Sequence, residues 1–168
     1  MDKHKIYIIT GAPGAGKSTA VAALLQLGVD YLVFDMDWLA APASALAAKD
    51  IYTDPTTWPA YNALWLALLQ RVCQNGKTPL LFAPLAPSDL APSDPSLTCL
   101  ELAWLLLDCD DATRRRRLAT RPGWTDAMIG EALADAQVLR QSIHTQVDTS
   151  HRPPAAVAGQ IVAWLDEL

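Results

Sequence analysis

Residues 11–18 read Gly-Ala-Pro-Gly-Ala-Gly-Lys-Ser and decide the fold, because they fit the pattern G-x-x-x-x-G-K-[ST] in the context that this pattern requires. The apolar run Lys5–Thr10 before them predicts a buried strand, and Lys17–Leu27 after them predicts a helix that Gly28 ends. Glycines let such a loop curl so that successive backbone N–H groups point inward, and the positive N-terminal end of the helix adds to the same field. The strand, turn and helix together predict a cradle for the phosphates of a nucleoside triphosphate.

The polar residues at the end of this loop have separate expected roles. Lys17 is expected to reach the β- and γ-phosphates, the Ser18 hydroxyl to ligate Mg²⁺, and Thr19 to contact the α-phosphate side. The alternative is a chance glycine-rich turn, which the four fixed positions would produce in about one chain in a hundred of this length. The predicted nucleotide-binding set is continuous: Gly11, Ala12, Pro13, Gly14, Ala15, Gly16, Lys17, Ser18 and Thr19.

Strand-like and helix-like stretches alternate along the rest of the chain. The expected strands are Tyr31–Phe34, Pro79–Phe82, Leu100–Leu107 and a very short one at Val147–Asp148. The expected helices are Met36–Lys49 (interrupted by Pro42), Trp58–Gln74, Ala112–Arg121, Thr125–Gln146 and Pro154–Leu168. Four prolines make residues 83–96 a loop that holds at most a short helix. Continuous apolar strands between helices predict an α/β protein, a parallel sheet with helices on both faces, in one domain spanning residues 1–168.

Composition and charge argue against several classes of protein. The chain is 51% hydrophobic, yet no apolar run approaches the roughly 18 residues that a membrane span needs. A net charge of −5 argues against a nucleic-acid-binding protein, which usually presents a basic face. Cys73, Cys99 and Cys109 show no metal-binding spacing and are expected to be buried thiols in a reducing compartment. We therefore expect a cytoplasmic protein that binds neither nucleic acid nor a membrane.

The stretch GAPGAGKST resembles the phosphate loop of the adenylate kinase-like and shikimate kinase-like P-loop kinases. The layout agrees along the whole chain, but only the loop is specific in sequence. The resemblance implies the P-loop NTPase fold, a three-layer sandwich around a five-stranded parallel sheet of order 2-3-1-4-5, with a short mobile lid at about residues 112–126 over ATP. Residues 147–150 resemble the segment that lines the adenine, which would place Asp148 and Thr149 beside the base. Simple capping of the loop by these residues is equally consistent with the sequence.

Two carboxylates, Asp35 and Asp37, follow the expected second strand at its C-terminal end. Ligands bind at this edge of an open α/β sheet. Phosphoryl transfer needs an acceptor hydroxyl that is aligned and can lose its proton, and a positioned aspartate can serve both needs. We therefore interpret Asp35 as the general base, or as part of the Mg²⁺ shell through water, and Asp37 as a hydrogen-bonding partner of the acceptor. Alternatively, either residue could simply cap the helix that follows.

Five of the 13 basic residues lie between residues 114 and 121. Arg114, Arg117 and Arg121 share one face of the expected helix, because they are three and seven residues apart. An arginine that closes over the γ-phosphate would stabilise the negative charge of the transition state and exclude water. The segment RLATR resembles the R-L-x-x-R of related kinases, which favours Arg117 and Arg121 as the catalytic lid pair and Arg117 also as a nucleotide contact. Any one of these arginines could instead be part of a solvated surface, and Arg140 is a weaker candidate.

The expected acceptor-binding region, residues 36–99, contains only three basic residues, Lys49, Arg71 and Lys77. Nucleoside monophosphate kinases need arginines here for the acceptor phosphate, and shikimate kinases need them for a carboxylate. The sequence departs from both patterns, although Arg71 alone could serve. Scarcity of positive charge therefore favours a neutral acceptor.

Aromatic side chains are frequent in the same region, and they suit a neutral, partly apolar acceptor such as an antibiotic, a nucleoside or a sugar-like alcohol. Trp58, Tyr61 and Trp65 have the spacing of an ordinary buried helix face, so core packing explains them equally well. Trp38, beside the acidic pair, is the better candidate for an acceptor contact. In motif order alone, the chain also resembles chloramphenicol phosphotransferases and tunicamycin-resistance ATP-binding proteins.

These features together predict an ATP- and Mg²⁺-dependent kinase that transfers the γ-phosphate to a small-molecule acceptor, as a monomer or a homodimer. Two alternatives remain. One is a nucleoside monophosphate kinase. The other is a nucleotide-dependent switch or binding ATPase, for which Leu105–Asp108 could serve as a Walker B strand. Against it, no glutamate follows Asp108 to activate water, and the N-K-x-D motif that reads guanine is not in the sequence.

Overall fold

A computed structural model describes residues 4–90 and 100–167 of the chain. Within them, five strands form one sheet in which every neighbouring pair is parallel. The strands are β1 (His4–Thr10), β2 (Leu32–Asp35), β3 (Pro79–Ala83), β4 (Leu100–Asp108) and β5 (Gln146–Asp148). Their order is β2-β3-β1-β4-β5, which confirms the predicted fold class and strand order.

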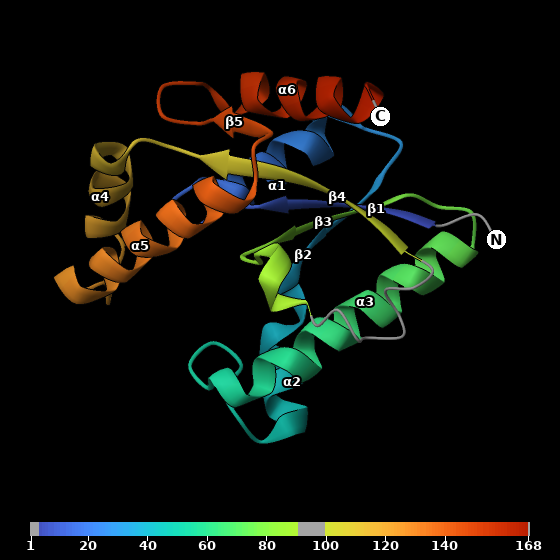
Figure 1. Cartoon of the computed structure of the whole chain (residues 1–168), viewed down its shortest axis with the longest axis horizontal. Coiled ribbons are helices and arrows are strands. Elements are labelled where there is room, and N and C mark those ends of the chain that lie inside the picture. The colour runs from blue at the N-terminus through green and yellow to red at the C-terminus, as the bar shows by residue number, and fades with distance from the viewer. Residues whose placement is uncertain (1–3, 91–99, 168) are drawn as a thin grey trace.

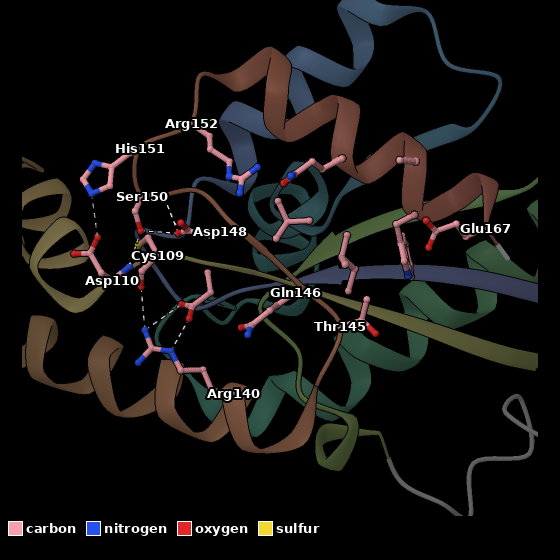
Figure 2. A pocket seen from close by; sticks show the side chains of 16 residues that line it. Cys109, Asp110, Arg140, Thr145, Gln146, Asp148, Ser150, His151, Arg152 and Glu167 are labelled. Atoms are coloured by element: carbon pink, nitrogen blue, oxygen red, sulfur yellow. Dashed lines mark hydrogen bonds and ion pairs between the residues drawn. The ribbon is translucent and has the colours of Figure 1, made fainter.

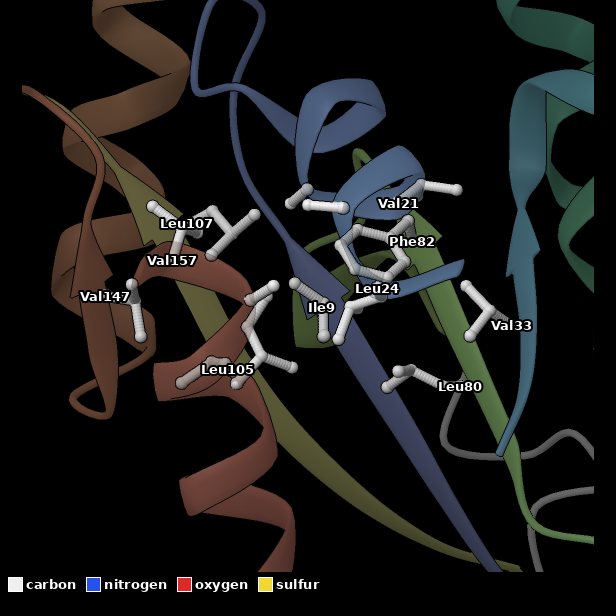
Figure 3. Packing of buried hydrophobic residues seen from close by; sticks show 14 of the residues in the cluster. Ile9, Val21, Leu24, Val33, Leu80, Phe82, Leu105, Leu107, Val147 and Val157 are labelled. Atoms are coloured by element: carbon white, nitrogen blue, oxygen red, sulfur yellow. The ribbon is translucent and has the colours of Figure 1, made fainter. Parts of the chain in front are cut away.

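The central strands bury side chains on both faces, because successive residues of a strand point to opposite sides. On one face, Ile9 and its neighbours pack against α1 (Lys17–Leu27) and α6 (Pro154–Asp166). On the other face, Ile8 packs with the apolar side of α3 (Trp58–Gln74). Figure 1 shows α1 and α6 together above the sheet and α3 below it, and Figure 3 shows the first of these two cores. The helix–sheet–helix layers thus follow directly from the continuous apolar strands.

The remaining helices gather around the carboxyl ends of the strands. They are the short turns η1 (Met36–Leu39), η2 (Pro55–Thr57) and η3 (Pro87–Asp89), together with α2 (Ala40–Ala47), α4 (Asp111–Ala119) and α5 (Asp126–Ser142). Of these, α5 packs on the same side of the sheet as α3, against Leu106 of β4.

Many element boundaries differ from the sequence-based prediction by one or two residues, and the start of α2 and the end of α5 differ by four. Asp35 belongs to β2 itself, and a short 3-10 turn precedes α2, so Pro42 falls in the first turn of that helix, where its missing N–H is tolerated. Helix α5 was predicted to reach Gln146 but ends at Ser142. Ile143 is already extended, and the Leu106 N–H donates to the Thr145 carbonyl, because residues after 143 run into the pairing of β5 with β4.

Two of the three cysteines, Cys73 and Cys109, are buried free thiols as expected. Cys99 and the last part of the predicted proline-rich loop, residues 91–96, lie outside the described residues. Residues 84–90 do form a loop with only one short turn. Among the helices of the described segments, none has the length and apolar character that crossing a membrane requires.

Candidate functional site

The loop of residues 11–16 joins β1 to α1 and needs glycine at three positions. Gly14 and Gly16 have φ values of +82° and +93°, a region that residues with a side chain rarely adopt. Gly11 is required for a different reason. A Cβ atom on it would lie 2.5 Å from the Leu107 carbonyl oxygen of β4. The glycine pattern in the sequence therefore corresponds to backbone requirements.

Three successive carbonyl groups of the loop are bound from outside. The Pro13 carbonyl accepts from Arg114 Nη1 at 2.6 Å, and the Gly14 carbonyl accepts from Arg117 Nη1 at 3.0 Å. The Ala15 carbonyl accepts from the Thr149 hydroxyl at 2.8 Å. In a trans peptide the C=O and the following N–H point in opposite directions. Holding the Pro13 and Ala15 carbonyls outward therefore turns the N–H groups of Gly14 and Gly16 the opposite way, as a phosphate cradle requires, while the Ala15 N–H donates to the Ala12 carbonyl at 3.1 Å.

The Lys17 ammonium lies inside this arrangement and donates to the Gly11 carbonyl. Burial lowers the pKa of Lys17 to about 8, although the negative charges of Asp37 and Asp35 oppose that shift. Ser18 and Thr19 follow at the start of α1, where both are exposed. A partly buried cation, two accessible hydroxyls and a helix N-terminus thus converge at one point, which is a set that suits phosphate oxygens.

A pocket of about 460 Å³ opens beside the loop. Five of the twelve predicted nucleotide contacts line it, namely Gly14, Gly16, Thr19, Arg117 and Thr149, and Arg121 lines it as well. Lys17 and Ser18 are not among its lining residues. Asp148, which was predicted to line the base, instead faces a neighbouring groove of about 700 Å³ along β5 (Figure 2). There its carboxylate accepts from the Ser150 hydroxyl and backbone N–H, and these bonds lower its pKa.

The arginines that were predicted to share one helix face have different surroundings. Arg121 is exposed at the end of α4 and lines the nucleotide pocket. Arg117 also lines it, but its guanidinium is engaged with the Gly14 carbonyl and with the hydroxyl and carbonyl of Thr149. Arg114 is fully buried, and its role was not anticipated from the sequence. Arg140, a weaker candidate, binds Asp108 and the Cys109 carbonyl.

The carboxylate pair lies at the end of β2, on the Lys17 side of the site. Asp35 is 6% exposed, and its Oδ1 accepts from the Asp37 N–H at 3.1 Å. The capping alternative thus applies to Asp35, which caps η1. Partial burial raises the pKa of Asp37, and Asp35 raises it further, while Lys17 opposes the shift. Both carboxylates act on the pKa of Lys17 as well, so the acidic pair and this lysine form one electrostatic unit.

Two aromatic residues of the acceptor region are buried in the core, and two others are exposed. Tyr61 and Trp65 are buried in the core under α3, and the Tyr61 hydroxyl donates to the Met36 carbonyl between the two aspartates. Trp38 and Trp58 are about half exposed, at 51% and 48%. Trp38 is the better placed of the two, because it directly follows Asp37 in η1.

Arg71, the predicted basic acceptor contact, is not brought to this site. It lies near the C-terminal end of α3 and donates to Gln74. The Cys73 thiol two residues later contacts the Lys5 carbonyl, at the start of β1. The phosphate loop follows the other end of that strand. Arg71 therefore lies at the opposite end of the sheet from Lys17 and Asp35.

The expected metal ligands, Ser18 and Asp35, are not part of a larger protein metal site. The described segments contain no group of three or more histidine, cysteine, aspartate or glutamate side chains that could hold a metal ion. Mg²⁺ is typically bound through one or two protein ligands, several waters and substrate phosphates rather than by an all-protein cage. An exposed serine hydroxyl and a single carboxylate are the kinds of protein ligand that this mode of binding uses.

No family model matches the chain, and neither does any curated protein. Solved structures do match over nearly the full length. The tunicamycin resistance protein of Deinococcus radiodurans aligns with a TM-score of 0.69 at 22% identity, over 97% of this chain and 95% of that one. A sugar kinase from Janibacter sp. gives 0.66 at 17% identity, over 98% and 95%. Shikimate kinase from Acinetobacter baumannii gives 0.63 at 15% identity, over 98% and 94%. The chain thus shares the fold of P-loop small-molecule kinases.

Proposed function

We propose that the chain is a phosphotransferase that moves the γ-phosphate of Mg·ATP to a hydroxyl group of a small, neutral molecule. The observation that carries the proposal is the electrostatic unit of Lys17, Asp35 and Asp37 at the mouth of the phosphate loop. A phosphate-binding cation and a buried carboxylate close together are what a transfer reaction needs, whereas nucleotide binding alone needs only the loop. The kinase names of the matched structures agree with this proposal.

Each group then has a defined task. The loop amides and Lys17 hold the β- and γ-phosphates, and Ser18 would hold Mg²⁺, which would neutralise phosphate charge. Asp35 accepts the proton of the acceptor hydroxyl as its oxygen bonds to the γ-phosphorus. The bond from that phosphorus to the β–γ bridging oxygen breaks, and ADP leaves. Arg121, exposed at the lid, balances the charge that spreads over the transferring group.

The acceptor is proposed to be neutral because its side of the site lacks a free cation among the described residues. Lys49 pairs with Asp54, and Arg71 lies at the far end of the sheet. Lys77 follows the end of α3 at that same far end. A phosphate or carboxylate on the acceptor would therefore meet Asp35 and Asp37 without compensation. Exposed Trp38 and Tyr52 offer an apolar and weakly polar surface instead.

The switch or binding-ATPase alternative is less well supported. It would use Asp108 as a Walker B carboxylate, but both oxygens of Asp108 accept hydrogen bonds from Arg114 and Arg140. A carboxylate committed to two guanidinium groups is a poor partner for a metal ion or its water.

Turnover of ATP with and without acceptors tests the proposal. The panel should contain neutral antibiotics, nucleosides and sugar alcohols, with shikimate and nucleoside monophosphates as charged comparisons. We expect phosphate to be transferred to a neutral acceptor and little hydrolysis in its absence. Rapid ATP hydrolysis that no acceptor changes would instead indicate the ATPase, and transfer to a monophosphate would indicate the nucleotide kinase.

A further inference from the structure

Helix α4 packs directly against the phosphate loop. A Cβ atom added to Gly14 would lie 3.2 Å from the Cγ atoms of both Arg114 and Leu118, so loop and helix are in direct contact. Arg117 of this helix and Arg121, two residues past its end, line the nucleotide pocket, but Arg114 does not. Its side chain is buried beneath the loop, with no exposed surface.

The guanidinium of Arg114 joins the loop to the end of β4. Nη1 donates to the Pro13 carbonyl at 2.6 Å, and Nη2 donates to the Asp108 carboxylate. Among residues 4–90 and 100–167 its Nε has no hydrogen-bond partner. Burying a guanidinium with one unsatisfied donor is unfavourable, and a buried ion pair adds little net stability compared with apolar packing. The arrangement is therefore better explained by the geometry it imposes than by stability.

Asp108 is itself fixed by a second arginine from another helix. Arg140 of α5 binds both carboxylate oxygens of Asp108, the Cys109 carbonyl at 2.9 Å and Asp111 at 3.1 Å. Figure 2 shows Arg140 reaching from α5 toward Cys109. Arg114 is thus a rigid spacer between Pro13 and a carboxylate that cannot easily move.

We propose that Arg114 is a positioning residue, which holds the Pro13 carbonyl outward and so keeps the phosphate loop in its nucleotide-accepting shape before any nucleotide arrives. The inference rests on nucleotide binding by the loop, which is part of the proposed function. Arg114 acts through the loop backbone and not by contact with phosphate. Its loss should weaken the binding of nucleotide, because part of the binding free energy is then spent on ordering the loop.

The test compares Arg114→Met with Arg115→Met, a change of the same charge at an exposed position of the same helix. Methionine keeps much of the apolar volume, and Asp108 remains paired with Arg140. We expect the dissociation constant of Mg·ATP, measured by calorimetry without an acceptor, to rise about tenfold for Arg114→Met and to stay unchanged for Arg115→Met. Arg114→Lys, which keeps the charge but cannot bridge both partners, should lie between Arg114→Met and the unaltered protein.

Hydrogen exchange separates positioning from a general structural role. In the nucleotide-free protein, the amides of residues 14–17 should exchange faster in Arg114→Met, while the β1 and β4 amides keep their protection. An unchanged affinity and unchanged loop exchange would overturn the inference, as would equal loss of protection throughout the sheet. If Arg114→Met does not fold, the nucleotide affinity and the loop hydrogen exchange of Arg114→Lys test the inference instead. Failure of the unaltered protein to bind Mg·ATP would count against the proposed function, and loop exchange would still test Arg114.

Discussion

The two halves of the site are built differently. On the nucleotide side, backbone carbonyls of Pro13, Gly14 and Ala15 are each held by a side chain from a distant segment. On the acceptor side, Trp38 and Tyr52 are half exposed or more, and the only link from the Tyr52 hydroxyl is a 3.5 Å contact to the Asp37 carbonyl among the described residues. One half is specified by main-chain geometry, and the other by side chains on short turns.

The difference indicates how the two functions of the site can be separated. A triphosphate is recognised by charge and by converging N–H groups, so its half depends on a fixed backbone. An acceptor is recognised by shape and a few polar contacts, so its half can change by substitution without disturbing the loop. The following experiments test whether nucleotide binding and acceptor chemistry are separable in this way.

The largest effect is expected for Asp35→Asn. Loss of the group that accepts the hydroxyl proton should lower the rate of phosphate transfer about a thousandfold. Mg·ATP affinity should change little, since asparagine can still cap η1 through its side-chain oxygen. Acceptor-dependent ADP release and calorimetry measure the two quantities. Asp30→Asn, at an exposed position two residues before the same strand, is the control. Full transfer by Asp35→Asn would show that Asp35 is not the base.

Lys17→Ala should mainly weaken nucleotide binding. Removing the ammonium deletes charge-assisted bonds to two phosphates, so the dissociation constant of Mg·ATP should rise about a hundredfold. Transfer then falls as well, because less nucleotide is bound. Lys77→Ala removes an exposed lysine from the turn before β3 and should leave affinity unchanged. Equal affinities in the two variants would contradict the assignment of Lys17.

Nucleotide affinity should depend on pH through Lys17. Burial lowers its pKa to about 8, whereas bound phosphate favours the protonated form and raises the pKa again. Affinity should therefore be complete below about pH 8 and fall as the pH rises, by about tenfold between pH 7 and pH 9. Calorimetry in buffers of different ionisation enthalpy should detect proton uptake on binding near pH 8. A dissociation constant that is constant over this range would exclude the coupling.

The smallest effect is expected for Tyr61→Phe. The change deletes the hydroxyl that binds the Met36 carbonyl and leaves that buried carbonyl without its donor. Unfolding free energy should fall by about 1 kcal/mol in urea denaturation. Because Met36 lies between Asp35 and Asp37, transfer should weaken while Mg·ATP affinity stays constant. Tyr52→Phe, which removes an exposed hydroxyl, should leave stability unchanged; an altered nucleotide affinity in Tyr61→Phe would mean that the halves are coupled.

The sequence predicted best the features that depend on local backbone geometry. The loop was predicted correctly because its backbone has a positive φ at Gly14 and Gly16, and glycine at such positions can be recognised in the sequence alone. The alternation of apolar runs similarly predicted a parallel sheet between helices. The end of α5 was missed, because local helix propensity extends to Gln146 and only pairing with β4 overrides it. The strand order came from the resemblance and not from the residues.

Residues whose surroundings come from distant segments were harder to predict. Helical spacing placed Arg114 on the same face as Arg117 and Arg121, but its contact with Pro13 spans 101 residues. An aspartate six residues earlier, at the end of an apolar strand, was a signal that could have suggested a buried pair. Arg71 was favoured only as one of few cations in its region, since composition does not reveal which end of a helix a residue occupies. The capping role of Asp35 is local, and the sequence did offer it as the alternative to a catalytic role.

The contact between Thr149 and the Ala15 carbonyl joins residues that are 134 positions apart. During synthesis, the ribosome completes the glycine-rich loop first, and its partner directly after β5 follows about 7 to 27 s later at typical elongation rates. Throughout that interval the nascent loop lacks Thr149, and for most of it Arg114 and Arg117 as well. A nascent chain that ends before Thr149 should therefore hold nucleotide weakly, and full nucleotide affinity should arise only after Thr149 has been added.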